Sequence, residues 1–406
     1  MNVKTPLPAI AAGLIALLGA PVATEAASLD YLGQQIVPNN ATFGGTAIGG
    51  LSGIDYDAAT GQFVAISDDR SALNAARFYT LGLDLGQFTR ANGAGSAGVQ
   101  FSGVTTLLAP SGLPYASNGV DPESIRFVHS AGGTSVLWGN EGLRSGAPAS
   151  YQVPTVREST LAGGYVRDLA VPSYYAPTGS AGGTSAGDSG IRNNLAFESL
   201  TISTDGKSAF VATENALVQD GPRTSLTQSS PSRVAQYSLA TGALTAEYVY
   251  NVDPIAFAPA GDRGLVEMLA VGENRFLALE RSFSTGFNIY VYLVDATGAT
   301  NVAGMGSLAG QSYTAMSRTL LLDMSTVKND DGSALFTDNI EGVTLGPMVN
   351  GKQTLIFVSD NNFNAAEVTQ FVAFTVNGSL VPEPQMWALW LGGLAAMGAV
   401  ARRRRG

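Results

Sequence analysis

Acidic residues recur at fixed places in a short phrase that occurs five times in this chain, at 50–56, 121–127, 196–202, 265–271 and 339–345. Four copies place a glutamate before an alternating apolar stretch, whereas the first has Ser52 there; the glutamates are Glu123, Glu198, Glu267 and Glu341. A second apolar run follows each copy and ends in an acid, namely Asp68, Glu141, Glu214, Glu280 and Asp360. Clustered carboxylates can hold a hard cation or move protons as general acids and bases.

The elements that must position these acids follow from the period of the repeat. The anchor positions 52, 123, 198, 267 and 341 lie 71, 75, 69 and 74 residues apart, which is typical of a repeat architecture. Each repeat holds about four alternating apolar runs separated by turn signals such as Asp205-Gly206. The sequence therefore predicts an all-β fold, a β-propeller of five four-stranded blades. Six blades are the alternative, because a propeller repeat is usually shorter, about 40–50 residues.

The ends of the repeat array predict how the ring closes. The fifth repeat lacks a fourth strand, and the apolar run at residues 29–37 has no blade of its own. We expect this N-terminal strand to complete the fifth sheet. The two acids of each hairpin are then neighbours at one end of an antiparallel pair. Because the first strand of a blade is innermost, the acids are expected to ring the mouth of the central channel.

Something must offset the repulsion between so many carboxylates, and the sequence leaves three partners open. Oxygen-rich sites without thiols suit Ca²⁺, with neutral oxygens available from Asn140, Asn215, Asn361 and Asn362. Arginines within the same motifs are the second possibility, namely Arg70, Arg126 and Arg281. In the third, purely structural case the glutamates accept backbone N–H bonds from the next blade and lock the blades together.

Other catalytic signals are weak. The single histidine, His129, stands at the end of an expected strand, which is typical of a surface or packing residue. The segment Gly187-Asp-Ser-Gly190 resembles the nucleophile segment of trypsin-like proteases, but nothing else of that family is present. No nucleophile elbow, phosphate-binding loop or zinc motif occurs, and there is no cysteine. Metal-activated water with carboxylate bases is the remaining hydrolytic chemistry.

Both ends of the chain have the pattern of targeting signals. Residues 1–26 combine Lys4, an apolar run at 7–20 and small residues at 23–27, which predicts a secretory signal peptide. Residues 381–406 contain Pro-Glu-Pro, an apolar run at 385–401 that would form a transmembrane helix, and four arginines. This tail resembles a PEP-CTERM sorting signal; a permanent tail anchor is the alternative. The resemblance implies export by a Gram-negative bacterium, an inner-membrane intermediate with transient anchoring, exosortase processing, and release to the cell surface or extracellular matrix.

The remaining domain, residues 27–380, is acidic. The whole chain has a formal net charge of −10, and removing both signals deletes five cations and two acids, which leaves about −13. Such a surface argues against nucleic-acid partners. Without cysteine, a sizeable hydrophobic core must hold the fold.

The repeated phrases resemble the phytase-like family described as "esterase-like activity of phytase". The resemblance rests on 50–56 with 67–71, 121–124, 197–200 with 213–215, 280–283, and 339–342 with 358–361, and it covers about residues 45–376. It implies a propeller that hydrolyses esters or phosphoesters with the help of calcium. Phytate itself fits poorly, because phosphate recognition needs cationic clusters and residues 27–380 hold only Lys207, Lys328 and Lys352 as lysines.

Three functions follow from these patterns. The first is an exported, Ca²⁺-dependent hydrolase of small phosphoester or carboxylic ester substrates. Its metal would be held by Asp68, Glu123, Glu198, Glu214, Glu341 and Asp360, and its catalytic residues would be Glu267, Glu280, Arg281 and Arg70. The second is a non-enzymatic module that binds extracellular polysaccharide or a matrix partner through its loops. The third is a purely structural surface protein.

Overall fold

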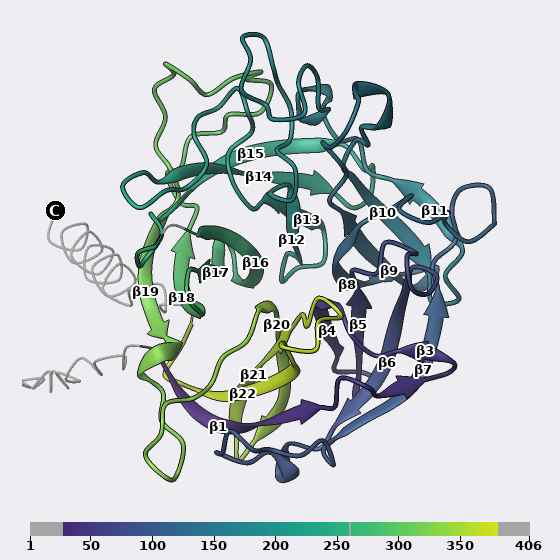
Figure 1. Cartoon of the computed structure of the whole chain (residues 1–406), viewed down its shortest axis with the longest axis vertical. Helices are drawn as coiled ribbons and strands as arrows, with labels where there is room; N and C mark the ends of the chain where they lie inside the picture. Colours follow the sequence, from purple (N-terminus) through teal and green to yellow (C-terminus); the bar gives the residue numbers. More distant parts are fainter. Residues whose placement is uncertain (1–26, 260, 381–406) are drawn as a thin grey trace, which may run out of the picture. The chain divides into compact units, whose positions relative to one another are not determined.

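The computed structural model describes residues 27–259 and 261–380, which fold into five four-stranded antiparallel sheets around a common axis (Figure 1). From the inside outward, blade 1 contains β4 (Leu51–Asp57), β5 (Gln62–Ser67), β6 (Arg77–Leu83) and β7 (Val99–Thr106). Blade 2 contains β8 (Pro122–Ser130), β9 (Gly133–Asn140), β10 (Thr155–Thr160) and β11 (Tyr165–Asp168). Blade 3 contains β12 (Phe197–Ile202), β13 (Ser208–Thr213), β14 (Ser230–Ser238) and β15 (Leu244–Val252).

Blade 4 contains β16 (Asp262–Gly272), β17 (Arg275–Phe283), β18 (Phe287–Asp295) and β19 (Ser317–Asp323). Blade 5 contains β20 (Ile340–Val349), β21 (Lys352–Ser359) and β22 (Thr369–Asn377), and its outer strand is β1 (Ser28–Val37). The first strands of the blades contact one another in the cycle β4, β8, β12, β16, β20 and back to β4. The five-bladed prediction is therefore confirmed, and the described residues contain no sixth blade.

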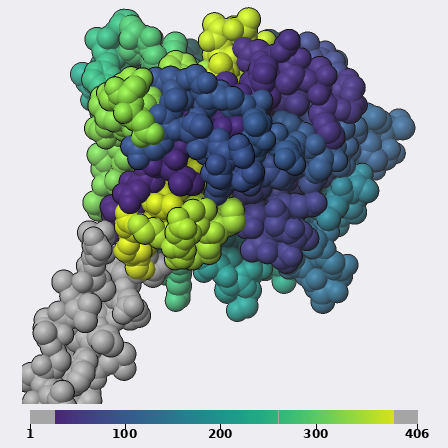
Figure 2. Space-filling view, turned by 90° about the horizontal axis from the view of Figure 1, so that it is seen from below, coloured from purple at the N-terminus to yellow at the C-terminus, as the bar shows by residue number. Residues whose placement is uncertain are grey.

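The N-terminal strand closes the ring as predicted. β1 pairs with β22 in antiparallel register, with Gln34 opposite Val372 and Val37 opposite Thr369. Figure 2 shows the purple N-terminal residues beside the yellow residues of blade 5. This pairing ties the first described strand to the last, so the backbone hydrogen bonds of β22 are satisfied on both sides.

The third strand of blade 2 begins later than its sequence suggests. Residues 151–156 alternate like a strand, whereas β10 runs from Thr155 to Thr160. The preceding residues form a loop, because Pro148–Ser150 is a 3-10 turn and Gln152 makes an isolated bridge to Leu143. A short ladder of β2 (Thr42–Phe43) and β3 (Thr46–Ala47) was not predicted.

Helix is confined to four 3-10 turns within the described residues: Leu85–Gln87, Pro148–Ser150, Ser173–Tyr175 and Met324–Thr326. None of the helices in this part of the chain is long and apolar enough to cross a membrane. The predicted signal peptide at 1–26 and the predicted sorting signal at 381–406, with its helix at 385–401, lie outside the described residues.

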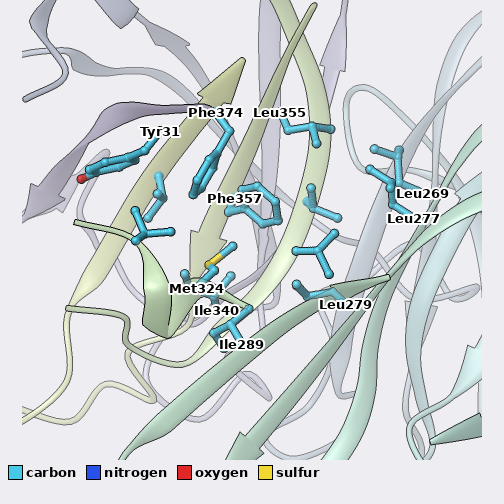
Figure 3. Close-up of a cluster of buried hydrophobic side chains, with 14 of the residues drawn as sticks. Tyr31, Leu269, Leu277, Leu279, Ile289, Met324, Ile340, Leu355, Phe357 and Phe374 are labelled. Atoms are coloured by element: carbon cyan, nitrogen blue, oxygen red, sulfur yellow. The ribbon is translucent and has the colours of Figure 1, made fainter. Parts of the chain in front are cut away.

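The core fills the spaces between neighbouring blades. Between blades 4 and 5, Leu277 and Leu279 face Phe357 and Phe374 (Figure 3). The rings of Phe357 and Phe374 stand edge to face with centroids 5.6 Å apart, and Tyr31 of β1 packs 5.5 Å from Phe374. Burying one side chain of this size stabilises the folded state by about 1.5–3 kcal/mol relative to leaving it exposed. These apolar contacts hold a chain that has no disulfide.

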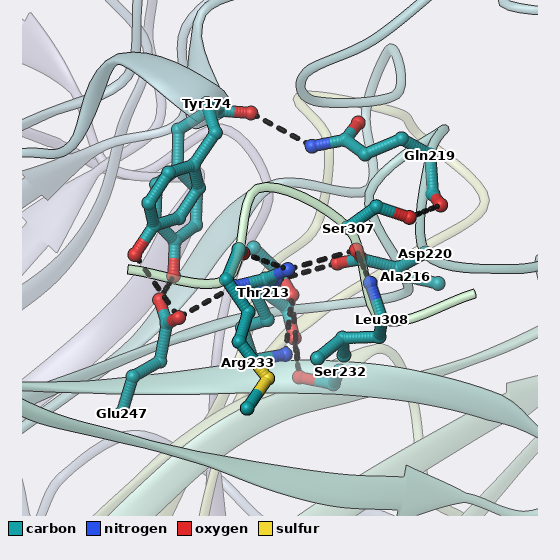
Figure 4. Close-up of polar contacts among 12 residues, drawn as sticks. Tyr174, Thr213, Ala216, Gln219, Asp220, Ser232, Arg233, Glu247, Ser307 and Leu308 are labelled. Atoms are coloured by element: carbon teal, nitrogen blue, oxygen red, sulfur yellow. Dashed lines mark hydrogen bonds and ion pairs between the residues drawn. The ribbon is translucent and has the colours of Figure 1, made fainter. Parts of the chain in front are cut away.

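A buried ion-pair network anchors the longest loops to blade 3 (Figure 4). Arg233 of β14 donates to Asp220 at 2.6 and 2.8 Å and to Glu247 at 2.5 Å, and both side chains of the Arg233–Glu247 pair are fully buried. Tyr174 and Tyr175 donate their hydroxyl protons to the same Glu247 carboxylate. The loop at residues 170–196 is thereby fixed to the sheet.

Candidate functional site: an acidic ring at one end of the innermost strands

A β-bulge presents the first acid of a hairpin in three blades. The ladder between the first two strands skips Glu123 in blade 2, Glu198 in blade 3 and Glu341 in blade 5, and it skips Ser52 in blade 1. A bulge leaves its residue unpaired and re-aims its side chain. The closing acid follows the second strand directly, and its backbone N–H bonds back across the hairpin, as in Glu214 N to Ala196 O at 2.6 Å. The predicted pairing of acids is confirmed in these blades.

Blade 4 differs because its ladder is displaced by one residue. Leu265 lies opposite Glu280 and Glu267 lies opposite Leu279, so Val266 occupies the bulge position. Arg281 then occupies the closing position, which an acid fills in every other blade. The prediction that Glu267 and Glu280 form an acid pair like the others is therefore wrong in register. In blade 4 the ring has an apolar residue and a cation instead.

The carboxylates at this end form a mutually interacting set that we call the acidic ring. It consists of Asp68, Asp121, Glu123, Glu141, Glu198, Glu214, Asp262, Glu341 and Asp360, together with Arg70 and Arg281. Sequence reasoning missed Asp121 and Asp262. Asp121 stands two residues before Glu123 in the repeated phrase and could have been found there. Asp262 opens β16 in a blade whose register the sequence did not reveal.

Arginines neutralise part of the ring. Arg281 donates to Glu341 at 2.9 Å and to Glu214 at 3.2 Å, and its guanidinium lies 3.9 Å from Asp262. Arg70 donates to Asp121 at 2.8 Å while 36% of its side chain stays exposed. Backbone also contributes, because Glu141 accepts the N–H of Ala196 from the next blade at 2.8 Å. Arginine partners and backbone N–H donors from the next blade, the two alternatives to a metal, are thus both partly present in the described structure.

Burial and mutual repulsion favour the protonated form of several ring carboxyls. Burial raises the pKa of Glu198 well above its ordinary range, and the charges of Glu141 and Glu214 raise it further. Burial likewise raises the pKa of Asp68 to about 7, with Glu341 and Asp121 adding to the effect. The pKa of Glu214 rises to about 8 through burial, even though Arg281 lowers it. Strong shifts from burial and like charge together are typical of functional sites.

Three ring carboxylates are placed to share one cation. Oxygens of Asp121, Glu123 and Glu141 all lie within 4.8 Å of one another, and all three residues are buried. Only 9% of Glu198 is exposed, yet its carboxylate makes no hydrogen bond or ion pair with the described residues. A buried Oδ1 of Asp68 also lacks a hydrogen-bond partner in this part of the chain. These unpaired oxygens point to a ligand that the chain does not supply.

Backbone geometry makes room for the ring. A Cβ on Gly264 would lie 2.0 Å from the Oε1 of Glu214, and one on Gly50, whose φ is +62°, would lie 2.0 Å from the Oδ1 of Asp68. Neighbouring loops hold Ser71 at φ 59° and Phe363 at φ 49°, in the left-handed region that side chains rarely adopt. Strained backbone of this kind clusters at ligand sites.

Two predicted catalytic residues lie outside the ring. Glu267 is 1% exposed and accepts hydrogen bonds from Arg126 at 2.7 Å and from Leu200 N at 3.0 Å. Glu280 is fully buried and bound by Tyr250 at 2.7 Å and by two arginines, Arg263 and Arg318. Their polar atoms are occupied by structural partners. Arg70 and Arg281 do lie in the ring, as do the predicted metal-ligating acids.

The weaker sequence signals correspond to structural features. His129 has 56% of its side chain exposed and lies 3.6 Å from Asp57, near the end of β8, where it pairs with Thr134. In the Gly-Asp-Ser-Gly segment, the Asp188 carboxylate accepts the backbone N–H groups of Ser180 and Ser185, both at 2.8 Å. Asp188 therefore fixes its own loop.

Comparison with known proteins shows the family. No curated protein matches this sequence. A solved structure titled "Structure of Dos1 propeller" is similar at 8% identity with a TM-score of 0.32; the match covers 79% of this chain and 66% of that chain, and no argument depends on it. The model of the family "Phytase-like: Esterase-like activity of phytase" matches residues 46–363, which contain every residue of the acidic ring. The chain therefore belongs to this phytase-like family.

Proposed function

We propose that this protein is an exported, Ca²⁺-dependent hydrolase of phosphoester or carboxylic ester substrates, acting at the acidic ring. One observation carries the proposal: Asp121, Glu123 and Glu141 bring buried carboxylate oxygens within 4.8 Å of one another beside the unpartnered Glu198. Family membership supports hydrolysis in general terms.

The donor set fits calcium. The ring offers only oxygen, without thiol or imidazole, and hard cations such as Ca²⁺ take 6–8 oxygen ligands. Asp121, Glu123 and Glu141 would hold the ion, and the unpaired oxygen of Asp68 fits the same role. A bound Ca²⁺ would supply Lewis-acid polarisation of the substrate's oxygen.

The chain's own residues supply proton transfer and charge. Burial and the charges of Glu141 and Glu214 raise the pKa of Glu198 well above its ordinary range, so this carboxyl takes up a proton more readily than a free one and gives it up when positive charge is nearby. That property suits a general acid or base. The guanidinium of Arg70 is partly exposed at the edge of the ring and can donate to an oxygen that gains negative charge. Arg281 holds Glu214 and Glu341 in place.

The test is turnover by purified residues 27–380 on a panel of p-nitrophenyl phosphate and short p-nitrophenyl esters, in calcium and in chelator. We expect hydrolysis in calcium, its loss in chelator, and at least about a 100-fold loss of kcat/KM in a Glu123→Gln/Glu141→Gln double variant. Glu273→Gln, at the exposed β16–β17 turn, is the matched control. Absence of turnover on every substrate in any metal would refute the proposal.

A polysaccharide-binding role is the second candidate. The long loop at 170–196 is rigidly anchored by Tyr174 and Tyr175, and rigid loops suit recognition. Glycan binding by this domain without turnover on any ester would favour it.

Export rests on the sequence signals at both ends. Mass spectrometry of the protein from the native cell envelope should find termini near residues 27 and 381. Intact ends at residues 1 and 406 would contradict processing.

A further inference from the structure

Two arginines of blade 3 lack the acidic partner that nearly every other cation of this domain has. Among residues 27–259 and 261–380, all but three of the lysines and arginines contact a carboxylate within 4.0 Å; the exceptions are Arg192, Arg223 and Lys328. Acids outnumber cations in this part of the chain, so an arginine without a carboxylate is an exception that asks for an explanation. Two of the three exceptions lie in neighbouring loops.

Arg192 and Arg223 lie close together. The Arg192 guanidinium donates to Gly221 O at 2.6 Å through Nη2 and to Ala216 O at 3.0 Å through Nε. Gly221 is two residues from Arg223. Burial lowers the pKa of Arg192, and the nearby charges of Arg144 and Arg223 lower it further. Arg223 itself is exposed, and its side chain makes no hydrogen bond or ion pair with the described residues.

The carboxylates of the same loops are already occupied. Asp220 accepts hydrogen bonds from Arg233 on both of its oxygens, at 2.6 and 2.8 Å (Figure 4). Asp188 accepts backbone N–H groups of its own loop and lies 3.8 Å from Arg144. Neither acid is within ion-pair distance of Arg192. The positive charge of the two arginines is therefore available to a ligand.

Both arginines are carried by loops at the end of blade 3 that bears the acidic ring. Arg223 belongs to the β13–β14 loop, which begins with Glu214 of the ring. Its neighbour Thr224 donates its backbone N–H at 2.9 Å to the side chain of Asn215, the residue after Glu214. Arg192 belongs to the segment that leads into β12, and its two hydrogen bonds fix it to the β13–β14 loop. The arginine pair thus borders the ring without belonging to it.

We propose that Arg192 and Arg223 bind an oxyanion group, a carboxylate, sulfate or phosphate, on a substrate whose ester bond lies at the acidic ring, so that preferred substrates carry a negative charge apart from that bond. The assignment of the anion to a substrate rests on the proposed function, whereas anion binding needs no turnover. The donors of Arg223 are free, and Nη1 of Arg192 makes no hydrogen bond with the described residues. Guanidinium groups bind oxyanions through short, charge-assisted hydrogen bonds.

The first test is calorimetric titration of the purified protein in calcium with acetate, sulfate and methylphosphonate. We expect at least one of these anions to bind, and Arg223→Gln to weaken that binding about 10-fold or more, because charge-assisted hydrogen bonds are lost. Arg223→Lys should restore part of it. Since the Arg223 side chain has no partner in the protein, the variant should fold normally, which circular dichroism checks. Lys328→Gln is the matched control, because it removes an exposed, unpaired cation from the β19–β20 loop.

The second test compares hydrolysis of 4-nitrophenyl hexanoate with that of the same ester carrying a terminal carboxylate, sulfonate or phosphonate. At least one charged ester should exceed the neutral ester by about 10-fold or more in kcat/KM, and Arg223→Gln should reduce this ratio about 10-fold, whereas Lys328→Gln should leave it unchanged.

The outcomes of the two tests separate this inference from the proposed function. Absence of anion binding, or binding that Arg223→Gln leaves intact or that Lys328→Gln weakens equally, would overturn the site. Turnover without preference for any charged ester would overturn the assignment of the anion to the substrate and leave the hydrolase intact. Anion binding that depends on Arg223 but comes with no turnover would support the site and refute the hydrolase.

Discussion

Raising the pH should destabilise the metal-free protein, because the acidic ring holds protons more tightly when folded than when unfolded. Glu214 shows the effect clearly, since burial raises its pKa from 4.5 to about 8. The stability that the protonated Glu214 contributes is complete below the pKa of the unfolded chain. It is lost as the pH rises through the pKa of the folded protein. The window of loss therefore runs from about pH 4.5 to pH 8.

The magnitude follows from proton linkage. With pKa values of 4.5 unfolded and about 8 folded, Glu214 alone should cost about 3.5 kcal/mol of unfolding free energy between pH 5 and pH 8. Asp68, whose pKa is raised from 3.8 to about 7, acts in the same direction. The two effects overlap, because both groups are repelled by Glu341. At roughly 2 °C per kcal/mol for a domain of this size, Tm should fall by at least about 5 °C.

The assay is thermal unfolding by circular dichroism in chelator at pH 5, 6, 7 and 8. Millimolar calcium should remove most of the decline, because the cation binds the deprotonated ring and only in the folded state. Glu214→Gln should reduce the fall in Tm between pH 5 and pH 8 by the part that Glu214 causes. Glu273→Gln, at an exposed turn, should leave the fall in Tm unchanged. A metal-free Tm that is flat or rises from pH 5 to pH 8 would show that folding does not raise the pKa values of the ring carboxyls.

Three further outcomes follow from the same contacts. Arg281→Gln removes the cation beside Glu214 and should destabilise the metal-free protein by about 3–5 kcal/mol, with partial rescue by calcium in thermal melts. Glu247→Ala leaves Arg233 short of a buried partner and should cost a similar amount in urea unfolding, but calcium should not rescue it. Gly264→Ala would put a Cβ 2.0 Å from Glu214 and should weaken calcium binding at least about 10-fold by calorimetry, while conserving the sheet by circular dichroism.

The repeat and the closing strand were predictable because strand period and turn chemistry are local properties of the sequence. The pairing of acids was predictable too, wherever the bulge falls on the glutamate, as at Glu123. In blade 4 the predicted pairing of Glu267 with Glu280 was wrong, because a one-residue shift in a ladder is set by packing between strands and not by local spacing. Glu267 matched the phrase in sequence, yet Val266 occupies the bulge.

The one-residue shift in blade 4 makes the charge of the acidic ring uneven. If Glu267 and Glu280 stood where the phrase suggests, every blade from the second to the fifth would add carboxylates to one place, and only Arg70 would oppose them. The displaced ladder sends Glu267 to Arg126 and brings Arg281 between Glu214 and Glu341. Negative charge is therefore densest beside blade 2, where Asp121 and its neighbours converge, and is balanced beside blade 4. A cation is therefore favoured beside blade 2, whereas beside blade 4 Arg281 already neutralises the carboxylates.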